Sequence, residues 1–585
     1  MQVKLSLLSL CMLGALCACS SEESGLASDK QQVFSGDEAY INVRLADAGT
    51  LTKATDGGYE HGEHGANEHA VKSASFYFYD ANGNYMAKGG VWNDGTDIGG
   101  NSNIEFKSSN IIALSGLKNQ VYPKYMVTVL NEKKDFSSVS TLSDMEKTLS
   151  SESDEGIKNN IGGTECFTMS TTSYKHNDNT PYFVTEVTPD DFSTEPIPAD
   201  ISGIKAVNVY VERLAAKVTL GVDMTPVTLG SISDRKFYEI KANVVGIDGT
   251  DPAATGKLYV ELLGWKLNAT AKSSNIVKNI NKAWTDTELG FAWNNPNDFR
   301  SFWGMSFNYS KTDGNPNSNS AYPNSAKDMY NSGVLTPHKY LSYVNLENPT
   351  LLDGSANYCA ENTNTSGIVN ANSSAVTSVL LKAMVCDKDG NGLDLVRYNG
   401  VLFKQEQFLD YILNKMNTLS KLNVYVMTTG ATGGDVYTQI DKTFVELVNV
   451  SDGVVKVQLK ETAGDLYEVT AIEPTTGDKT FGLITDKTAI NNDFGDASLG
   501  AIGYKGGLMY YNIPIEHLNA TKNAEAAYGV VRNHHYAITV NKLENIGRGI
   551  WDPEEVIIPN NDDTYYIGAT ISILSWKLIT HTVGL

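Results

Sequence analysis

Apolar and polar residues alternate along several short segments of the chain, which is typical of strands with one buried face. The first such segment places four apolar residues on one side of an expected strand: Ala39, Ile41, Val43 and Leu45. Residues 73–79 are rich in aromatic side chains and are followed by turn-forming residues at 80–84, so a hairpin is predicted there. Further strands are predicted at 125–130, 207–211, 454–459 and 536–540.

Helical patterns are few. Residues 403–419 repeat apolar side chains at near-helical spacing, and Ser143 to Glu146 has the spacing of a capping box before a short helix. Asn, Ser and Gly crowd residues 311–333 and 361–375, which we expect to be surface loops. The pattern therefore predicts a mainly β fold made of sandwich domains, with a few short helices and long loops.

Composition and net charge exclude several classes of protein. The 585 residues include 46 Lys and Arg against 68 Asp and Glu, which gives a net charge of −22. Such an acidic surface repels phosphate, so nucleic acid is not an expected partner. Aromatic residues make up 9% of the chain, which is too many for a disordered acidic tail, and 51 Gly residues without sustained heptads exclude a coiled coil.

The N-terminus has the form of a secretory signal, with Lys4 before an apolar run at 5–16. The small residues before Cys19 resemble a bacterial lipobox, which predicts lipidation of Cys19; an ordinary signal peptide is the alternative. Residues 20–23 resemble the acidic export tag of Bacteroidetes surface lipoproteins. Apart from this region, we find no apolar stretch of about 18 residues that would span a membrane.

Three of the six cysteines lie in this signal region, and Cys166, Cys359 and Cys386 remain. An odd number permits at most one disulfide, and the sequence leaves open whether Cys359 and Cys386 pair. The absence of a Cys-x-x-Cys pair gives no indication of a zinc or redox motif.

Two segments carry residues that metals prefer. One has His61, His64 and His69 with Glu63 and Glu68, but its glycine-rich, non-helical sequence favours a solvated loop. The other, residues 387–392, resembles the start of a calcium loop, but Tyr398 stands where the bidentate Glu belongs. A hairpin turn between Met384 and Leu395 is therefore the preferred interpretation, and no metal or cofactor is expected.

Catalytic motifs are not evident. His534 and His535 beside Arg532 suggest general acid–base catalysis, but a structural role at the start of a strand is favoured. We find neither a Gly-x-Ser-x-Gly elbow nor a phosphate-binding glycine loop, so an enzyme is not predicted. Four tryptophans are a possible glycan-binding set, with core packing as the default: Trp265, Trp284, Trp293 and Trp303.

Four segments together resemble the major fimbrillins of Bacteroidales, the shaft subunits of type V pili, and most closely the short-fimbria branch. They are residues 211–218, 358–363, 528–536 and 573–578. The resemblance implies two transthyretin-like β-sandwich domains. It divides the chain into a signal peptide (1–19), a propeptide (20–53), an N-terminal domain (54–220), a C-terminal domain (221–572) and a donor strand (573–585).

The resemblance also implies a structural polymer that supports adhesion and biofilm formation. Members reach the outer membrane as lipoproteins, and a protease then cuts after a basic residue, which releases the first strand. We expect the cut at Lys53–Ala54, with Arg44 less favoured because it lies inside the alternating segment. The removable strand is then the one that carries Ala39, Ile41, Val43 and Leu45, and the mature subunit enters an extracellular fimbria.

The groove left behind is expected to accept the C-terminal strand of another subunit, through Trp576, Leu578, Ile579, Val583 and Leu585. Expected partners are further copies of the chain, accessory, anchor and tip subunits, the processing protease, and receptors on host or bacterial surfaces. In one alternative, the C-terminal strand pairs within its own domain. In another, the chain is a surface lipoprotein that does not polymerise, such as a tip, accessory or glycan-binding protein.

Overall fold

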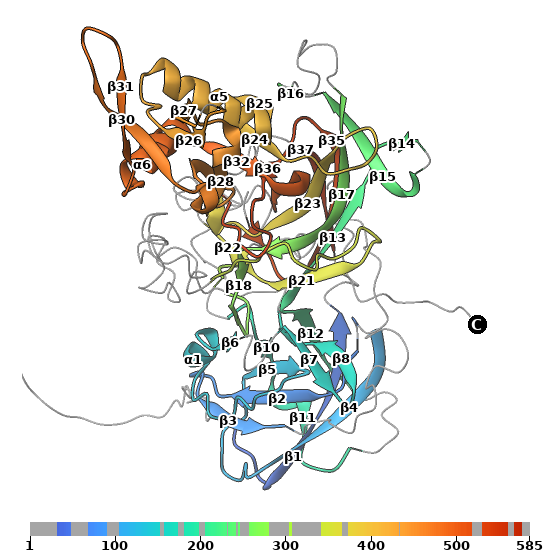
Figure 1. Cartoon of the computed structure of the whole chain (residues 1–585). Helices are drawn as coiled ribbons and strands as arrows, with labels where there is room; N and C mark the ends of the chain where they lie inside the picture. The colour runs from blue at the N-terminus through green and yellow to red at the C-terminus, as the bar shows by residue number, and fades with distance from the viewer. Residues whose placement is uncertain are drawn as a thin grey trace, which may run out of the picture.

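The computed structural model shows a mainly β fold, as the sequence predicts (Figure 1). It describes residues 32–47, 68, 70–89, 105–151, 157–172, 181–197, 205–230, 232–241, 244–245, 257–279, 304–306, 341–364, 373–431, 433–517, 529–559 and 567–575. The helices within these residues are α1 (Leu142–Glu146), α5 (Gln405–Thr418) and α6 (Thr488–Ala497). None of the described helices is both long and apolar enough to cross a bilayer.

The N-terminal sheet has the strand order β11-β1-β12-β9-β5-β2-β3, with β4 paired to β1 and β10 paired to β5. Its strands are β1 (Glu38–Asp47), β2 (Ala74–Tyr79), β3 (Tyr85–Lys88), β4 (Glu105–Ser115), β5 (Tyr125–Leu130), β9 (Met169–Thr171), β10 (Thr185–Glu186), β11 (Phe192–Ser193) and β12 (Val207–Arg213). The predicted hairpin is confirmed as β2 and β3, and the strands predicted at 125–130 and 207–211 are confirmed as β5 and β12.

The chain leaves this sheet at Leu214, where β12 ends and β13 (Ala215–Val222) begins in another sheet. The segment 211–218 that resembles fimbrillins therefore spans the end of β12 and the start of β13. Leu214 interrupts the ladder because its side chain is buried in a core cluster and its N–H donates to the carbonyl of Thr168 at 3.0 Å. One extended segment thus contributes to two sheets.

The sheet that β13 joins has the order β21-β13-β35-β37 and faces a six-stranded sheet across one core. Its other strands are β21 (Ala356–Ala360), β35 (His534–Leu543) and β37 (Ile567–Ser575). The six-stranded sheet contains β14 (Val227–Leu229), β15 (Ile232–Lys241), β17 (Lys257–Asn268), β23 (Ser378–Cys386), β33 (Leu508–Pro514) and β36 (Arg548–Gly549). Apolar side chains from both sheets share this core, which makes the pair a β-sandwich. Trp265 is fully buried there, as the core-packing default predicts; Trp284, Trp293 and Trp303 lie outside the described residues.

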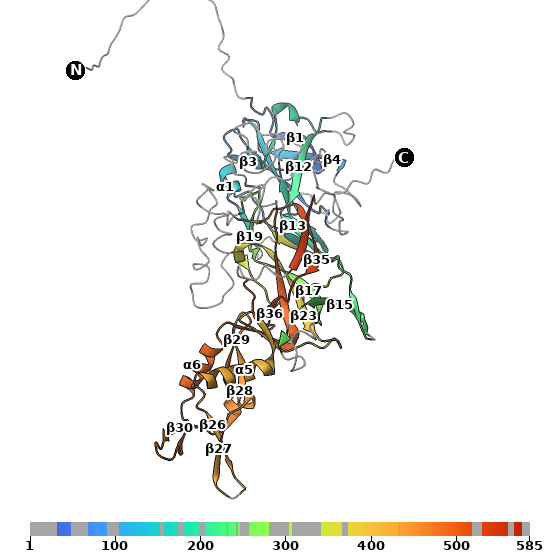
Figure 2. The same ribbon diagram turned by 90° about the horizontal axis from the view of Figure 1, so that it is seen from above.

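Residues 395–504 form a further body, which we call the distal lobe. It lies at the far end of the molecule from the N-terminal sheet (Figure 2). Its strands are β24 (Leu395–Tyr398), β25 (Val401–Lys404), β26 (Tyr425–Thr429), β27 (Asp435–Gln439), β28 (Val445–Ser451), β29 (Val454–Leu459), β30 (Leu466–Ile472), β31 (Lys479–Leu483) and β32 (Ala501–Tyr504). They form two sheets, β25-β24-β32-β29-β28 extended by β16 (Val244–Val245), and β27-β26-β30-β31.

The distal lobe has its own core, to which α5 contributes five buried side chains at helical spacing: Phe408, Leu409, Ile412, Leu413 and Met416. The helix predicted at 403–419 is therefore confirmed, as is the strand at 454–459, which is β29. The predicted cap of α1 is wrong by two residues, because Thr141 and not Ser143 caps it. The Thr141 hydroxyl accepts from the Asp144 N–H at 3.0 Å.

Four short strand pairs complete the described strands. They are β6 (Leu149–Ser151) with β19 (Ser273–Asn275), β7 (Lys158–Ile161) with β8 (Thr164–Phe167), β18 (Thr270–Ala271) with β20 (Leu341–Ser342), and β22 (Asn362–Thr363) with β34 (Gly529–Val530). The first pair joins the N-terminal part to the sandwich. The last places a short strand within the loop predicted at 361–375, because the buried Asn362 pairs with Val530.

The turn at 387–392 is confirmed and closes a short hairpin. Cys386 and Gly392 form an antiparallel bridge, and the Leu393 N–H donates to the Val385 carbonyl at 3.1 Å. The Asp387 carboxylate accepts from the N–H groups of Asp389 and Asn391 at 2.8 and 2.9 Å, which fixes a tight turn. The prediction of a hairpin turn between Met384 and Leu395 is therefore confirmed. Beyond the turn, β23 and β24 continue in different sheets, so the turn also leads the chain from the sandwich into the distal lobe.

Candidate functional site

Strand β1 lies in the interior of the N-terminal sheet. Along one edge it pairs antiparallel with β4, from Glu38 opposite Ser115 to Ala46 opposite Glu105. Along the other edge it pairs antiparallel with β11 near Tyr40 and then parallel with β12 from Val43 to Asp47. A strand held on both edges leaves two rows of unpaired backbone groups when it is removed.

The buried face of β1 is the face that alternation predicts. Ala39, Ile41 and Val43 are fully buried and belong to the core of the N-terminal sheet, whereas the side chain of Leu45 is not described. Asn42 on the other face is buried as well. Each large apolar side chain contributes roughly 1.5–3 kcal/mol through burial, so loss of β1 would uncover an apolar groove.

The predicted modification sites lie mostly outside the described residues. This applies to the lipidation site Cys19 and to the cut site Lys53–Ala54. Arg44 is described as part of β1, where it stands opposite Ser109 on one side and Asn208 on the other. A protease would have to open both ladders to reach that bond.

Strand β37 carries the last described residues. It forms an edge of its sheet and pairs antiparallel with β35, from Ile567 opposite Leu543 to Ser575 opposite His534. Residues 573–575 of the predicted donor segment are therefore paired within their own chain. The remaining donor residues lie outside the described part: Trp576, Leu578, Ile579, Val583 and Leu585.

Glu68 anchors the chain between β1 and β2. Its carboxylate contacts the Lys217 ammonium at 2.9 and 3.2 Å and accepts from the Tyr358 hydroxyl at 2.6 Å, while its carbonyl accepts from Arg213 Nε at 2.8 Å. Glu68 and Lys217 are both buried. Burial, together with the hydrogen bond and charge of Glu68, raises the pKa of the Tyr358 phenol. The contact ties the segment after β1 to the start of the sandwich.

This anchor also bears on the metal hypothesis. The Glu68 carboxylate is occupied by an ammonium and a phenol, and His61, Glu63, His64 and His69 lie outside the described residues. Across the described ranges, no group of three or more His, Cys, Asp or Glu side chains is arranged to hold a metal ion.

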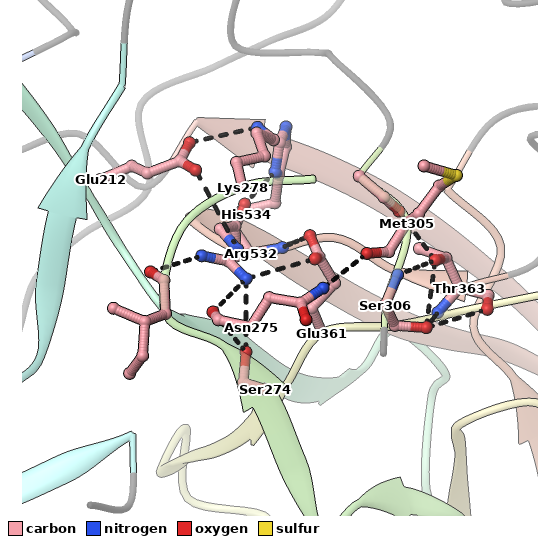
Figure 3. Close-up of polar contacts among 12 residues, drawn as sticks. Glu212, Ser274, Asn275, Lys278, Met305, Ser306, Glu361, Thr363, Arg532 and His534 are labelled. Carbon is pink, nitrogen blue, oxygen red and sulfur yellow. Dashed lines mark hydrogen bonds and ion pairs between the residues drawn. The ribbon is translucent and has the colours of Figure 1, made fainter. Parts of the chain in front are cut away.

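A second buried cluster, drawn in Figure 3, surrounds Arg532. Its guanidinium Nη2 lies 3.4 Å from Glu361 Oε1 and donates to the Asn275 carbonyl at 2.7 Å. Glu212 on β12 lies 4.0 Å from Arg532 Nε and pairs with the Lys278 ammonium at 3.1 Å. The two cations, Arg532 and Lys278, and the two anions, Glu212 and Glu361, have no net charge together. Charged side chains are buried at acceptable cost only when they are paired in this way.

Close packing holds this cluster in place. The Cβ of any residue larger than glycine at position 304 would lie 2.6 Å from the Glu361 carboxylate, so the backbone approaches as only glycine permits. His534 donates through Nδ1 to the Arg532 carbonyl at 2.7 Å, and His535 Nε2 shares a hydrogen bond of 2.8 Å with the Thr219 hydroxyl. Both histidines are buried, as befits the structural role favoured from the sequence.

Three of the four segments that carry the sequence resemblance meet at these two clusters. Residues 211–218 supply Glu212, Arg213 and Lys217; residues 358–363 supply Tyr358 and Glu361; and residues 528–536 supply Arg532 and His534. Asn533, with φ of 59°, adds a backbone bond to the Ala215 carbonyl at 2.7 Å. The sequence motifs are therefore the buried polar connection between the N-terminal sheet and the sandwich.

This buried polar connection is not apparent from the sequence alone. The only signal was the occurrence of charged residues within apolar strands, as with Lys217 between Ala216 and Val218. Charged residues at such positions are rarely buried unless they are paired.

The three described cysteines are buried, and none of them is in a disulfide. Cys359 and Cys386 therefore do not form the disulfide that the sequence left open. Burial raises the pKa of each of these two thiols to about 12, which keeps them protonated and unreactive at neutral pH.

Residues 503–582 match the family model described as major fimbrial subunit protein type IV, fimbrillin, C-terminal. The resemblance to fimbrillins is confirmed over these residues. The matched fimbrillin segment contains β33 to β37 and includes Arg532, His534 and the β35–β37 ladder. No curated protein matches the chain.

Solved structures of similar chains include fimbrial and adhesion proteins. A putative cell adhesion protein from Parabacteroides distasonis has 11% identity and a TM-score of 0.39, with 93% of this chain and 98% of that chain covered. A fimbrilin (fimA) from Porphyromonas gingivalis has 11% identity and a TM-score of 0.35 over the same shares. The tip fimbrial protein Mfa3 from Porphyromonas gingivalis has 12% identity and a TM-score of 0.30, with 92% and 100% covered. The resemblance to fimbrillins therefore rests on residues 503–582, which the family model matches.

Proposed function

We propose that the chain is the shaft subunit of a surface fimbria that assembles by exchange of a donor strand. The observation that carries the proposal is the position of β1. It is paired on both edges, buries an apolar face, and precedes the segment that contains Lys53–Ala54. A cut in that segment leaves β1 held by non-covalent contacts alone.

The proposed sequence of events begins with export, lipidation at Cys19 and arrival at the outer membrane. Cleavage at Lys53–Ala54 then frees the propeptide, and β1 leaves with it. The C-terminal segment of another copy enters between β4 and β12 and supplies the missing backbone partners and apolar side chains. Because the two contact surfaces differ, repetition gives an open filament and not a closed ring.

This proposal makes the chain a structural protein and not an enzyme. Its N-terminal domain (54–220), C-terminal domain (221–572) and donor segment (573–585) then have distinct roles in one subunit. Accessory, anchor and tip subunits, the processing protease and surface receptors are its proposed partners, and the extracellular fimbria is its final location.

One observation favours the alternative of a surface lipoprotein that does not polymerise. Residues 573–575 already pair with β35 of their own chain. Under the main proposal, β37 stays in place and only residues 576–585 reach the neighbouring subunit, so the two functions differ in what these last ten residues do.

The test uses the purified precursor with Cys19→Ala, digested briefly with a Lys/Arg-specific protease and run unboiled on an SDS gel. A ladder of stable oligomers is expected from the full chain, and none is expected after deletion of residues 576–585. Lys53→Ala should slow the appearance of the ladder, while the exposed Lys542→Ala serves as a matched control. A ladder that survives the deletion, or no ladder from the intact chain, contradicts the proposal.

A further inference from the structure

Strand β4 has β1 as its only strand partner among the described residues. The ladder between them runs from Glu38 opposite Ser115 to Ala46 opposite Glu105, and β4 lies outside β1 at the border of the sheet (Figure 1). The strands β12 and β5 are held differently, because β12 also pairs with β9, and β5 pairs with β2, β9 and β10. Of these three strands, β4 alone depends on β1 for its whole ladder.

The chain that follows β4 pairs with the predicted propeptide as well. The Asn119 N–H donates to the Phe34 carbonyl at 3.0 Å, and Val121 forms an antiparallel bridge with Val33. Every backbone bond that the structure describes between residues 105–121 and another segment ends on the propeptide. Loss of the propeptide therefore removes all of these bonds together.

Apolar burial links β4 to the same strand. Ile112 and Leu114 are 2% and 1% exposed and stand opposite Ile41 and Ala39, with which they share a core. Ala113 between them is exposed, so this part of β4 buries one face only, whereas β5 buries all six of its residues. When β1 leaves, β4 thus loses the apolar side chains beside it along with its ladder.

A strand stays ordered only where hydrogen bonds and burial offset the entropy cost of fixing its backbone. Without β1, the described contacts of β4 reduce to side chains packed across the core, such as Ile112 against Gly89 beyond the end of β3. We propose that β4 unpairs from the sheet when β1 leaves and becomes ordered again only when an entering strand takes the place of β1. This inference rests on the proposed function, and it makes β12 the fixed wall of the groove and β4 a wall that forms on binding.

The release of β4 bears on which strands the groove accepts. An exposed strand edge is a template for pairing with other chains, and the release leaves one long edge at the groove where two would otherwise stand. The entering strand has to order β4 as it binds, and this ordering cost lowers the affinity. A strand that pairs only with β12 is therefore held weakly, whereas one that pairs with both walls is held firmly. The two-residue strand β11, which also has β1 as its only partner in the described part of the chain, is expected to follow β4.

Hydrogen–deuterium exchange followed by mass spectrometry tests the release of β4. The Cys19→Ala precursor without residues 576–585 is cut briefly with the Lys/Arg-specific protease, freed of its propeptide by gel filtration in dilute urea, and returned to buffer. Because it lacks the donor residues, it stays monomeric under the proposed function. Amides of residues 105–121 should exchange at least tenfold faster than in the uncut chain, while those of β5 should change less than twofold.

A peptide of residues 32–49 should restore slow exchange to β4, and the Lys53→Ala precursor taken through the same steps is the matched control. The intact mass establishes that β1 has left. Slow exchange that persists in residues 105–121 of that species overturns the inference, even where the full chain still forms its ladder of oligomers. Equal acceleration in β4 and β5 overturns it as well, because the whole sheet would then have opened.

A peptide of residues 573–585 separates this inference from the donor-strand mechanism. If both hold, this peptide slows exchange in β4 as the peptide of residues 32–49 does. If only the peptide of residues 32–49 slows it, the dependence of β4 on β1 stands and the donor-strand mechanism fails.

Discussion

Strands β1 and β37 lie near opposite ends of the described chain and have different surroundings. β1 has partners on both edges and buries Ala39, Ile41 and Val43 in a core. β37 forms the edge of its sheet and has β35 as its only strand partner among the described residues. Removing an edge strand leaves the other strands of its sheet in register, whereas removing an interior strand separates them. The start of the chain is therefore where strand loss creates a groove.

The largest expected effect comes from removing β1 altogether. A chain that begins at Ala54 should lose roughly 5–10 kcal/mol of stability in the N-terminal sheet, from several buried side chains and two ladders of hydrogen bonds. A peptide of residues 36–49 should restore it, measured as a rise in melting temperature with added peptide. The same peptide with Ile41→Asp should fail, and equal rescue by both peptides would contradict a specific groove.

Glu68→Gln tests what holds the chain once β1 has left. Since it leaves the buried Lys217 without its counter-ion, we expect a loss of about 3–5 kcal/mol in the free energy of unfolding, measured with denaturant. The exposed pair of Lys542 and Glu544 is the control, where Glu544→Gln should change stability by less than about 1 kcal/mol. Equal effects would show that the anchor contributes no more than a surface ion pair.

Ile41→Ala probes the apolar face of β1 without removing its backbone. Truncation of this fully buried side chain should destabilise the precursor by about 2–5 kcal/mol in urea unfolding. Glu38→Ala at the exposed start of the strand should change stability by about 0.5 kcal/mol or less. If the two variants unfolded alike, the contrast between interior and edge strands would lose its energetic basis.

The smallest effect on stability is expected at the opposite edge of the N-terminal sheet, where Lys88 of β3 pairs with Asp135. Burial alone would raise the pKa of Asp135, but hydrogen bonds from Ser137 and the ammonium of Lys88 outweigh it and hold the pKa at about 2. Because its pKa is lowered, ionised Asp135 stabilises the fold at pH values above its ordinary pKa of 3.8. This contribution is lost as the pH falls toward 2. Since the side chain is 62% exposed, about 1 kcal/mol or less is expected.

The measurement compares unfolding of the native chain and Asp135→Asn between pH 2 and pH 6. The two stability curves should be separated above about pH 4 and converge below it. A separation that stays constant across this range would contradict the assignment to Asp135.

Local patterns predicted the strands and helices whose burial follows a simple period. Alternation located β1 because Ala39, Ile41 and Val43 enter one core, and helical spacing located α5 because its apolar side chains share one face. The turn at 387–392 was also readable, since Asp and Gly favour it regardless of distant contacts.

Properties that depend on contacts between residues far apart in the sequence could not be predicted. Apolar residues stand at odd positions up to Val211 and at even positions from Leu214, so the sequence shows a break in the alternation but not that β13 joins another sheet. Glu68 and Lys217 are 149 positions apart, and a single sequence does not show that either charge is buried. The distal lobe was missed as a separate body because alternation identifies strands without stating which ones pair.

The continuous chain from β12 into β13 bears on how a fibre of the proposed kind would resist tension. β12 runs beside β1, and β13 runs beside β35, which in turn carries β37. In a fibre of the proposed kind, tension from one subunit to the next would enter through the C-terminal segment and leave through the groove of β1. That force would act parallel to the strands and load many ladder hydrogen bonds in shear at the same time. Pulling such a fibre apart would require whole ladders to fail together.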